Sequence, residues 1–231
     1  MKRIVILGGS FNPVHNGHLR LAIEAGEAFD AERVDFVPSF RPPHKPQKGL
    51  LPYILRVKAL DAALEEYTGI RINQFEACFD APSYTYYTLQ DYKQREPEAE
   101  LFFVLGLADY AILNSWYNWE ELITLCNFIV VPRHGRSLQN FLNTTHQLWP
   151  NSVRTESIPP LISLRPNAWP EAQQVFFLPV PRLDISSSLI REKWQKDRRL
   201  DFLVPQNVLD LLQNHADEVD RAWLPEGDAQ A

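Results

Sequence analysis

Cysteine is scarce in this chain, and long apolar runs are absent. Only Cys78 and Cys126 occur among 231 residues, and they lack the close spacing of metal ligands. We therefore expect two free, buried thiols in a reducing compartment. No apolar run approaches the length of a membrane-spanning helix, and Ile4–Leu7 near the N-terminus is much too short for the core of a signal peptide. These absences predict a cytoplasmic protein with no membrane partner.

An excess of positive charge is also absent. Lysine and arginine together number 23 against 29 acidic residues, which gives a formal net charge of -6. A protein that grips a nucleic-acid backbone usually carries a basic stripe, so we expect no nucleic-acid partner. A small anionic ligand, bound by a few placed groups, fits this charge balance better.

The composition otherwise suits one globular domain. With 45% hydrophobic residues, the chain is long enough to bury a sizeable core. We assign residues 1–224 to a single domain, and we expect the tail 225–231, which lacks an apolar pattern, to be flexible.

Apolar strand-like runs alternate with helical segments along most of the chain. The expected strands are Ile4–Leu7, Val34–Val37, Ile70–Phe75, Leu101–Leu105, Phe128–Val131 and Val175–Leu178. The expected helices are Leu19–Phe29, Tyr53–Tyr67, Tyr84–Arg95, Ile185–Gln195 and Val208–Asn214. This alternation predicts an α/β fold, a Rossmann-like doubly wound parallel sheet with helices on both faces. In such folds the ligand lies beyond the carboxyl ends of the strands.

Residues 134–171 interrupt this alternation. They are rich in Asn, Thr, Pro, Gln and Ser, with Trp149 and Trp169 as isolated apolar anchors. We interpret the segment as an insertion that serves as a lid or as a contact in a homo-oligomer.

The strongest chemical signal is the segment from Gly8 to Leu19, which follows the first strand and opens the first helix. Its glycines let the backbone approach a ligand closely, and the helix N-terminus supplies N–H groups for an anion. His15 and His18 are three residues apart, so both imidazoles can face one side of the turn and stabilise charge on phosphate oxygens. A Walker loop is excluded, because no Gly-Lys-Ser/Thr follows at the required spacing.

A second signal is the serine cluster 186–188, which stands at the start of an expected helix. Its hydroxyls can cap the helix N–H groups and also bind an anion. Arg191 lies one turn further along, where a guanidinium can clamp phosphate oxygens in a bidentate manner. Alone, the cluster is also typical of an ordinary helix cap, and its pairing with the two histidines favours phosphate binding.

The run Gly-Gly-Ser-Phe-Asn-Pro-Val-His-Asn-Gly-His-Leu resembles the nucleotidyltransferases that carry a His-x-Gly-His motif, and among them the bacterial nicotinate-nucleotide adenylyltransferases. The resemblance runs from residue 1 to about residue 132, resumes near Val175, and includes the pattern Ile-Ser-Ser-x-x-Ile-Arg. It implies catalytic roles for His15, His18, Lys45 and Arg191. It implies an ATP site formed by Gly8, Gly9, Ser10, Phe11, Gly17, Gly106, Asp109, Ile185, Ser186 and Ser187.

The same resemblance suggests where the second substrate binds. It implies that Lys45, in the loop Pro-Pro-His-Lys, neutralises phosphate where the two substrates meet. Trp116 and Tyr117 can stack on a flat pyridine ring, although packing in the core is an alternative role for them. By resemblance, the substrate-binding residues are Ser83, Tyr84, Thr85, Trp116, Tyr117 and Arg133.

Three positions depart from the family pattern, and one of them, Asp197 in place of the glycine that usually follows the Ser-Ser helix, is expected to alter only a turn. The usual Gly-x-Asp becomes Gly106-Leu107-Ala108-Asp109, so Asp109 replaces the usual aspartate only if a shift of one residue is tolerated. The usual Ser-Tyr-Thr-x-Asp-Thr carries Tyr87 in place of the acid.

The resemblance implies an adenylyltransferase that transfers AMP from ATP to nicotinate mononucleotide (NaMN), giving deamido-NAD and pyrophosphate. Mg²⁺ is the expected cofactor, held mainly by ATP phosphates, so we expect no metal ligands from the protein. Three alternatives stay open. The acceptor could be nicotinamide mononucleotide (NMN), phosphopantetheine or a sugar or lipid phosphate; the chain could be a degenerate nucleotide-binding module without catalysis; or it could be a fragment of a tRNA-charging enzyme, which the negative charge disfavours.

Overall fold

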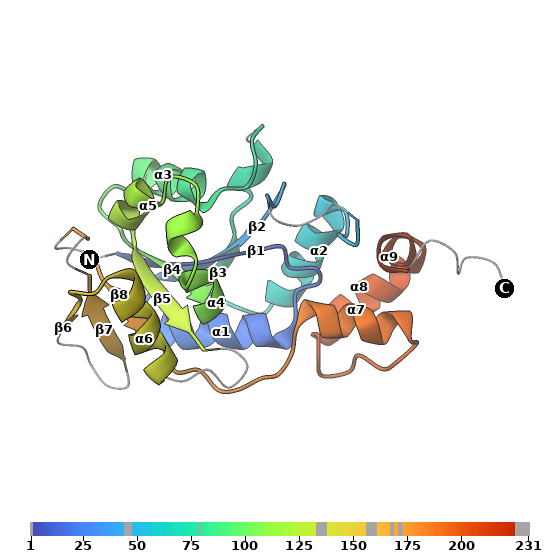
Figure 1. Ribbon diagram of the computed structural model, residues 1–231. Helices are drawn as coiled ribbons and strands as arrows, with labels where there is room; N and C mark the ends of the chain where they lie inside the picture. Colours follow the sequence, from blue (N-terminus) through green and yellow to red (C-terminus); the bar gives the residue numbers. More distant parts are fainter. Residues whose placement is uncertain are drawn as a thin grey trace.

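The computed structural model describes residues 2–43, 48–78, 80–132, 138–155, 161–166, 169–170 and 173–224. Within them, eight strands form one sheet in the order β3-β2-β1-β4-β5-β8-β7-β6 (Figure 1). The strands are β1 (Arg3–Gly9), β2 (Arg33–Pro38), β3 (Ile70–Ile72), β4 (Glu100–Gly106), β5 (Asn127–Val131), β6 (Val153–Thr155), β7 (Ile162–Arg165) and β8 (Val175–Phe177). The pairs from β3 to β8 are parallel, and the pairs β8-β7 and β7-β6 are antiparallel.

Helices cover both faces of this sheet (Figure 1). Their bounds are α1 (Asn16–Ala28), α2 (Tyr53–Leu64), α3 (Thr85–Arg95), α4 (Leu107–Tyr110), α5 (Trp119–Leu125), α6 (Leu138–Leu148), α7 (Ser187–Gln195), α8 (Gln206–Asn214) and α9 (Ala216–Trp223), with short 3-10 turns at Phe75–Cys78 and Leu113–Ser115. The side chains of β1 show how the two helix layers are held. Successive side chains of a strand point to opposite faces of the sheet, so they pack against different helices. Val5 packs in the cluster with α1, α2 and α8, whereas Ile4 and Ile6 pack in the cluster with α3 and α5. The predicted α/β fold with helices on both faces is confirmed.

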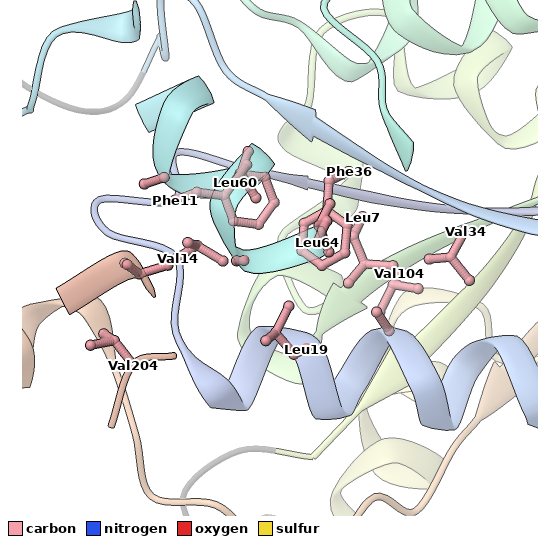
Figure 2. Close-up of a cluster of buried hydrophobic side chains, with 14 of the residues drawn as sticks. Leu7, Phe11, Val14, Leu19, Val34, Phe36, Leu60, Leu64, Val104 and Val204 are labelled. Atoms are coloured by element: carbon pink, nitrogen blue, oxygen red, sulfur yellow. The ribbon is translucent and has the colours of Figure 1, made fainter. Parts of the chain in front are cut away.

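The loop between β1 and α1 is anchored in the first of these clusters. Figure 2 shows Phe11 and Val14 of this loop packed near Leu60 of α2 and Val204, which precedes α8. Phe11 is only 3% exposed and Val14 is fully buried, so the loop has little freedom to move away from the sheet. The core therefore fixes the segment that the sequence singled out for chemistry.

Two expectations need correction. The predicted strand Ile70–Phe75 ends at Ile72, because the Asn73 side chain accepts a hydrogen bond from the Phe75 N–H at 2.9 Å and starts a turn. Both cysteines are free, as expected, but only Cys126 is buried, and Cys78 is exposed. Burial raises the pKa of the Cys126 thiol.

The polar segment 134–171 contains more regular structure than its composition suggested. Its described parts form α6 and the strands β6 and β7, which extend the sheet beyond β8. Trp149 and Trp169 act as the expected anchors: both are buried, and their rings pack at 5.1 Å. Its role as a lid or an oligomer contact stays a prediction. The tail 225–231 lies outside the described residues.

In the described part of the chain, no helix combines the length and the apolar character that crossing a membrane requires.

Candidate active site

A cavity of about 680 Å³ opens where β1, β4 and β5 end. This is the edge at which open parallel sheets bind ligands. One part, which we call the histidine wall, comes from segments 8–18 and 186–191, of which residues 8–12, 15, 18, 186–188 and 191 line the cavity. A second part, which we call the tyrosine wall, comes from residues 83–88 with Trp116 and Tyr117, and all of these except Tyr87 line the cavity. The cavity therefore joins the two groups of residues that the sequence assigned to different substrates.

The two histidines lie face to face at the start of α1. Their ring centroids are 3.6 Å apart and their planes differ by 22°. The His15 backbone N–H donates to Nδ1 of His18 at 3.2 Å, and Phe11 packs its ring edgewise against His18 at 5.1 Å. Because Nδ1 accepts, this bond assigns the proton of a neutral His18 to Nε2. His18 can then donate from Nε2 to an oxygen in the cavity.

Gly17 has a steric reason for its place between them. A Cβ at this position would lie 3.0 Å from Nδ1 of His15, closer than side chains normally pack. Gly17 does not itself line the cavity, and its lack of a side chain leaves room for the His15 ring.

The serine cluster and Arg191 also bind the loop between β1 and α1. The Ser186 hydroxyl caps α7 by accepting from the Leu189 N–H at 3.1 Å, which confirms the predicted helix cap. Ser187 donates to the Pro13 carbonyl at 2.9 Å, and Arg191 donates from Nη1 to the Asn12 carbonyl at 2.9 Å. Burial lowers the pKa of the Arg191 guanidinium, which nevertheless stays a cation near neutral pH. Residues 12–18 and 186–191 thus form one connected surface.

Arg56 is a supporting residue that the sequence analysis missed. It is 1% exposed, and it donates to the carbonyl of Ser10 at 2.8 Å and to that of Leu51 at 3.0 Å. Its guanidinium also lies 5.3 Å from the ring centroid of Tyr53. Burial lowers the pKa of Arg56 to about 10. A single charged residue on an otherwise apolar helix face was the signal that could have identified it.

Asn12 connects three segments of the chain, and its role was also not foreseen. Its side chain donates to the Gly49 carbonyl at 2.7 Å and accepts from the Leu51 N–H at 3.0 Å. The same oxygen accepts from the Trp223 indole at 3.3 Å. The C-terminal helix α9 therefore contacts the loop that carries the histidines.

The end of β4 forms the floor of the cavity. Gly106 and Asp109 both line it, and Gly106 precedes the short helix α4. Ala108, at the usual aspartate position, is not among the lining residues. Neighbouring residues on a helix differ by about 100° in direction, so the shift of one residue decides which side chain faces the cavity.

The tyrosine wall consists of aromatic contacts. Tyr84 and Tyr117 are stacked with centroids 4.5 Å apart and planes 14° apart. The Tyr87 hydroxyl donates to the Tyr117 hydroxyl at 3.1 Å. Trp116 lines the cavity and packs edgewise on Phe103 at 6.3 Å, so it belongs to both the cavity and the core.

A partly buried carboxylate organises the base of the tyrosine wall. Glu76 accepts from the Thr88 hydroxyl at 2.8 Å and from the Phe40 N–H at 3.4 Å. Burial raises its pKa, and the hydrogen bonds from Ser83 and Thr88 oppose that shift. Ser83 also accepts from the Arg41 N–H at 2.9 Å, so this serine joins the wall to the loop before Lys45.

Most residues predicted for the site line this one cavity. They are Gly8, Gly9, Ser10, Phe11, His15, His18, Ser83, Tyr84, Thr85, Gly106, Asp109, Trp116, Tyr117, Ser186, Ser187 and Arg191. Ile185 is partly buried and packs against the core instead. Lys45 and Arg133 lie outside the described residues. Besides the supporting residues above, the cavity is lined by Lys48 and Glu76, which the sequence did not single out.

Comparison with known proteins identifies the family. The profile of the cytidylyltransferase-like family matches residues 6–193. A probable nicotinate-nucleotide adenylyltransferase of Clostridium acetobutylicum is 31% identical over 215 residues, which cover 93% of this chain and 98% of that protein. A protein of the same description from Citrifermentans bemidjiense is 34% identical over 206 residues, with 89% and 93% of the two chains covered.

The fold is similar to that of a solved structure. Plasmodium falciparum nicotinic acid mononucleotide adenylyltransferase, complexed with NaAD, matches with a TM-score of 0.71 at 19% identity, over 94% of this chain and 98% of that chain. At this identity the likeness concerns the fold alone. The family assignment rests on the sequence relatives, and by them this chain belongs to the cytidylyltransferase-like family and, within it, to the nicotinate-nucleotide adenylyltransferases.

Proposed function

We propose that the chain transfers AMP from ATP to nicotinate mononucleotide, with deamido-NAD and pyrophosphate as products. One observation carries the proposal: the histidine wall and the tyrosine wall face one cavity of about 680 Å³. That volume lies within the usual range for ligand pockets, so it suits two small substrates held next to each other. The proteins named as relatives support the choice of substrates.

The proposed reaction is a displacement at phosphorus. An oxygen of the NaMN phosphate attacks the α-phosphorus of ATP, the bond from that phosphorus to the bridging oxygen breaks, and the electron pair leaves with pyrophosphate. No covalent enzyme intermediate is required, so the protein acts by positioning and by stabilising charge.

The histidine wall supplies that stabilisation. His18 donates from Nε2 to a phosphate oxygen, and His15 stacks on its ring and fixes its orientation. Arg191 adds a cation, and the N-terminus of α7 at Ser186 and Ser187 adds N–H and hydroxyl donors for the pyrophosphate part of ATP. We also assign Lys45 to the phosphates and Arg133 to the acceptor, as the family resemblance implies.

Asp109 is proposed to hold the ribose hydroxyls of ATP, because its carboxylate borders the cavity at the end of β4. It would replace the aspartate expected one position earlier. The tyrosine wall is proposed to bind the pyridine ring of the acceptor by stacking.

Mg²⁺ is proposed as the counter-ion of ATP. No group of three His, Cys, Asp or Glu side chains within the described residues is arranged to hold a metal ion. We propose that the cation takes its ligands mainly from phosphate oxygens and water. When bound, it would neutralise charge on the phosphates. A cytoplasmic location and a homo-oligomeric state remain expectations of the sequence.

Pyrophosphate release tests the proposal. The purified protein is incubated with ATP and Mg²⁺ and with NaMN, NMN or no acceptor, and the dinucleotide is identified by mass. We expect rapid release with NaMN, slower release with NMN, and almost none without an acceptor. Rapid release with NMN alone would reassign the acceptor, and no release with either would refute the activity.

A further inference from the structure

Tyr87 stands where the family pattern has an acid, and the structure gives this tyrosine a specific partner. Its hydroxyl donates to the Tyr117 hydroxyl at 3.1 Å, and the two ring centroids are 5.5 Å apart. Tyr87 belongs to the first turn of α3, whereas Tyr117 precedes α5. The bond therefore joins two segments of the tyrosine wall that are distant in the sequence.

The position of Tyr117 limits where a pyridine ring can stack. Tyr117 is stacked on Tyr84 at 4.5 Å, which is the short end of the range for aromatic pairs. No third ring fits between two rings at this separation. Tyr117 is 43% exposed and lines the cavity, so part of it is open to a ligand.

The surroundings of Tyr117 are themselves held in place. Tyr86 contacts the ring of Tyr117 edgewise at 5.9 Å. The Tyr86 hydroxyl donates to Glu121 of α5 and accepts from Gln90 of α3. Among these tyrosines, Tyr84, Tyr86 and Tyr117 line the cavity, and Tyr87 does not. Tyr87 can therefore influence a ligand through the lining tyrosines that it contacts: Tyr117 by a hydrogen bond, and Tyr84 and Tyr86 by ring contacts.

We propose that Tyr87 is a positioning residue: its hydroxyl latches Tyr117 onto Tyr84 and so orders the wall against which the pyridine end of the acceptor binds. The latch prepares a ligand-binding wall before the acceptor arrives, which reduces the ordering that binding requires. The acid of the family pattern cannot make the same phenol–phenol bond with the same ring contacts. The proposal rests on the proposed function, because it needs a pyridine acceptor.

The test is a double-mutant cycle on the two hydroxyl groups. Wild type, Tyr87→Phe, Tyr117→Phe and the double variant are compared by steady-state kinetics with NaMN and ATP. Loss of one hydrogen bond that orders the wall is expected to raise the KM for NaMN about three- to tenfold, with kcat and the KM for ATP within about twofold. The double variant should match Tyr87→Phe, because both single changes remove the same bond.

Two further variants sharpen the comparison. Tyr67→Phe removes a phenol hydroxyl from a position that is 38% exposed and does not line the cavity, and it should leave all constants unchanged. Tyr87→Asp introduces the usual family residue, and it should raise the KM for NaMN at least as much as Tyr87→Phe. An unchanged or lowered KM in Tyr87→Phe, or multiplicative effects in the double variant, would overturn the latch.

A second readout separates the latch from the proposed function. Thermal unfolding of the ligand-free protein is measured for the same four variants. Non-additive shifts in Tm support the latch even if wild type does not use NaMN, and additive shifts refute it. Absence of pyrophosphate release by wild type and by Tyr67→Phe refutes the proposed function alone.

Discussion

The two walls of the cavity are built in different ways. The histidine wall is held by two arginines that donate to main-chain carbonyls: the buried Arg56 to Ser10 and the partly buried Arg191 to Asn12. The tyrosine wall is held by contacts between partly exposed side chains, such as the stacked pair Tyr84 and Tyr117. Buried hydrogen bonds are costly to break, whereas exposed ring contacts adapt more easily. We infer that the wall proposed for ATP is held by the core, and that the wall proposed for the acceptor is held by contacts among its own side chains, including the bond between Tyr87 and Tyr117.

The largest effect is expected within the histidine wall. His18→Ala should lower kcat by about two to three orders of magnitude, because it removes a donor aimed at the developing charge. The fold should survive, since the side chain lies at the cavity and not in the core. Pyrophosphate release and thermal unfolding measure the two effects. His146→Ala, at an exposed position of α6, is the control, and near-normal activity of His18→Ala would contradict the mechanism.

Arg56 tests whether the histidine wall depends on buried support. Arg56→Met leaves the carbonyls of Ser10 and Leu51 without this donor, so the free energy of unfolding should fall by about 2–3 kcal/mol. A displaced loop should also lower kcat by about tenfold. Urea unfolding and steady-state kinetics check both, with Arg95→Met at the surface as the control. A stable, fully active Arg56→Met would show that the loop keeps its geometry without this residue.

Asp109 lies between the two walls and should give a smaller effect. Asp109→Ala should raise the KM for ATP about three- to tenfold with little change in the KM for NaMN, because a charged acceptor for ribose hydroxyls is lost. Adding Ala108→Asp restores the usual family position. If this double variant recovers a normal KM for ATP, either position can hold the ribose. An unchanged KM in Asp109→Ala would remove Asp109 from the ATP site.

The smallest effect concerns the base of the tyrosine wall. Burial raises the pKa of Glu76 above its ordinary value of 4.5, so the folded chain binds a proton there more readily than the unfolded chain. The stabilisation from this proton is fully present at pH values below the pKa of Glu76 in the unfolded chain. It is lost as the pH rises through the pKa of Glu76 in the folded chain. The free energy of unfolding of Glu76→Gln should therefore rise relative to that of wild type as the pH increases from about 4 to about 7. Urea unfolding at both pH values measures this difference in stability, and Glu66→Gln, at an exposed position, is the control. A difference that does not change with pH would contradict the prediction.

The difference between the walls also explains what the sequence could predict. The histidine wall comes from two short runs, Gly8–His18 and Ser186–Arg191, whose chemistry and positions after strands are readable locally. Their supports are not readable in this way: Arg56 and Trp223 reach the loop only through the tertiary fold. The sequence predicted Ser83, Tyr84, Thr85, Trp116 and Tyr117 of the tyrosine wall but not Tyr86 and Thr88. The bond between Tyr87 and Tyr117 depends on how α3 and α5 pack.

The fold, like the site, was predictable where a short run of sequence carries the signal. The central strands were predictable because both of their faces are buried, as at Ile4–Leu7 and Phe128–Val131. The strands β6 and β7 were not predicted, because they are short and their segment is polar. Trp149 and Trp169 were the one local sign that the segment packs against the sheet.

The central claim is that the two walls bring ATP and NaMN together for transfer of AMP. The most direct measurement follows ATP labelled at the α-phosphorus in reactions with NaMN, using wild type and His18→Ala. The account predicts label in deamido-NAD with wild type and almost none with His18→Ala. Label that stays in ATP with wild type, or reaches the dinucleotide equally well with His18→Ala, would contradict it.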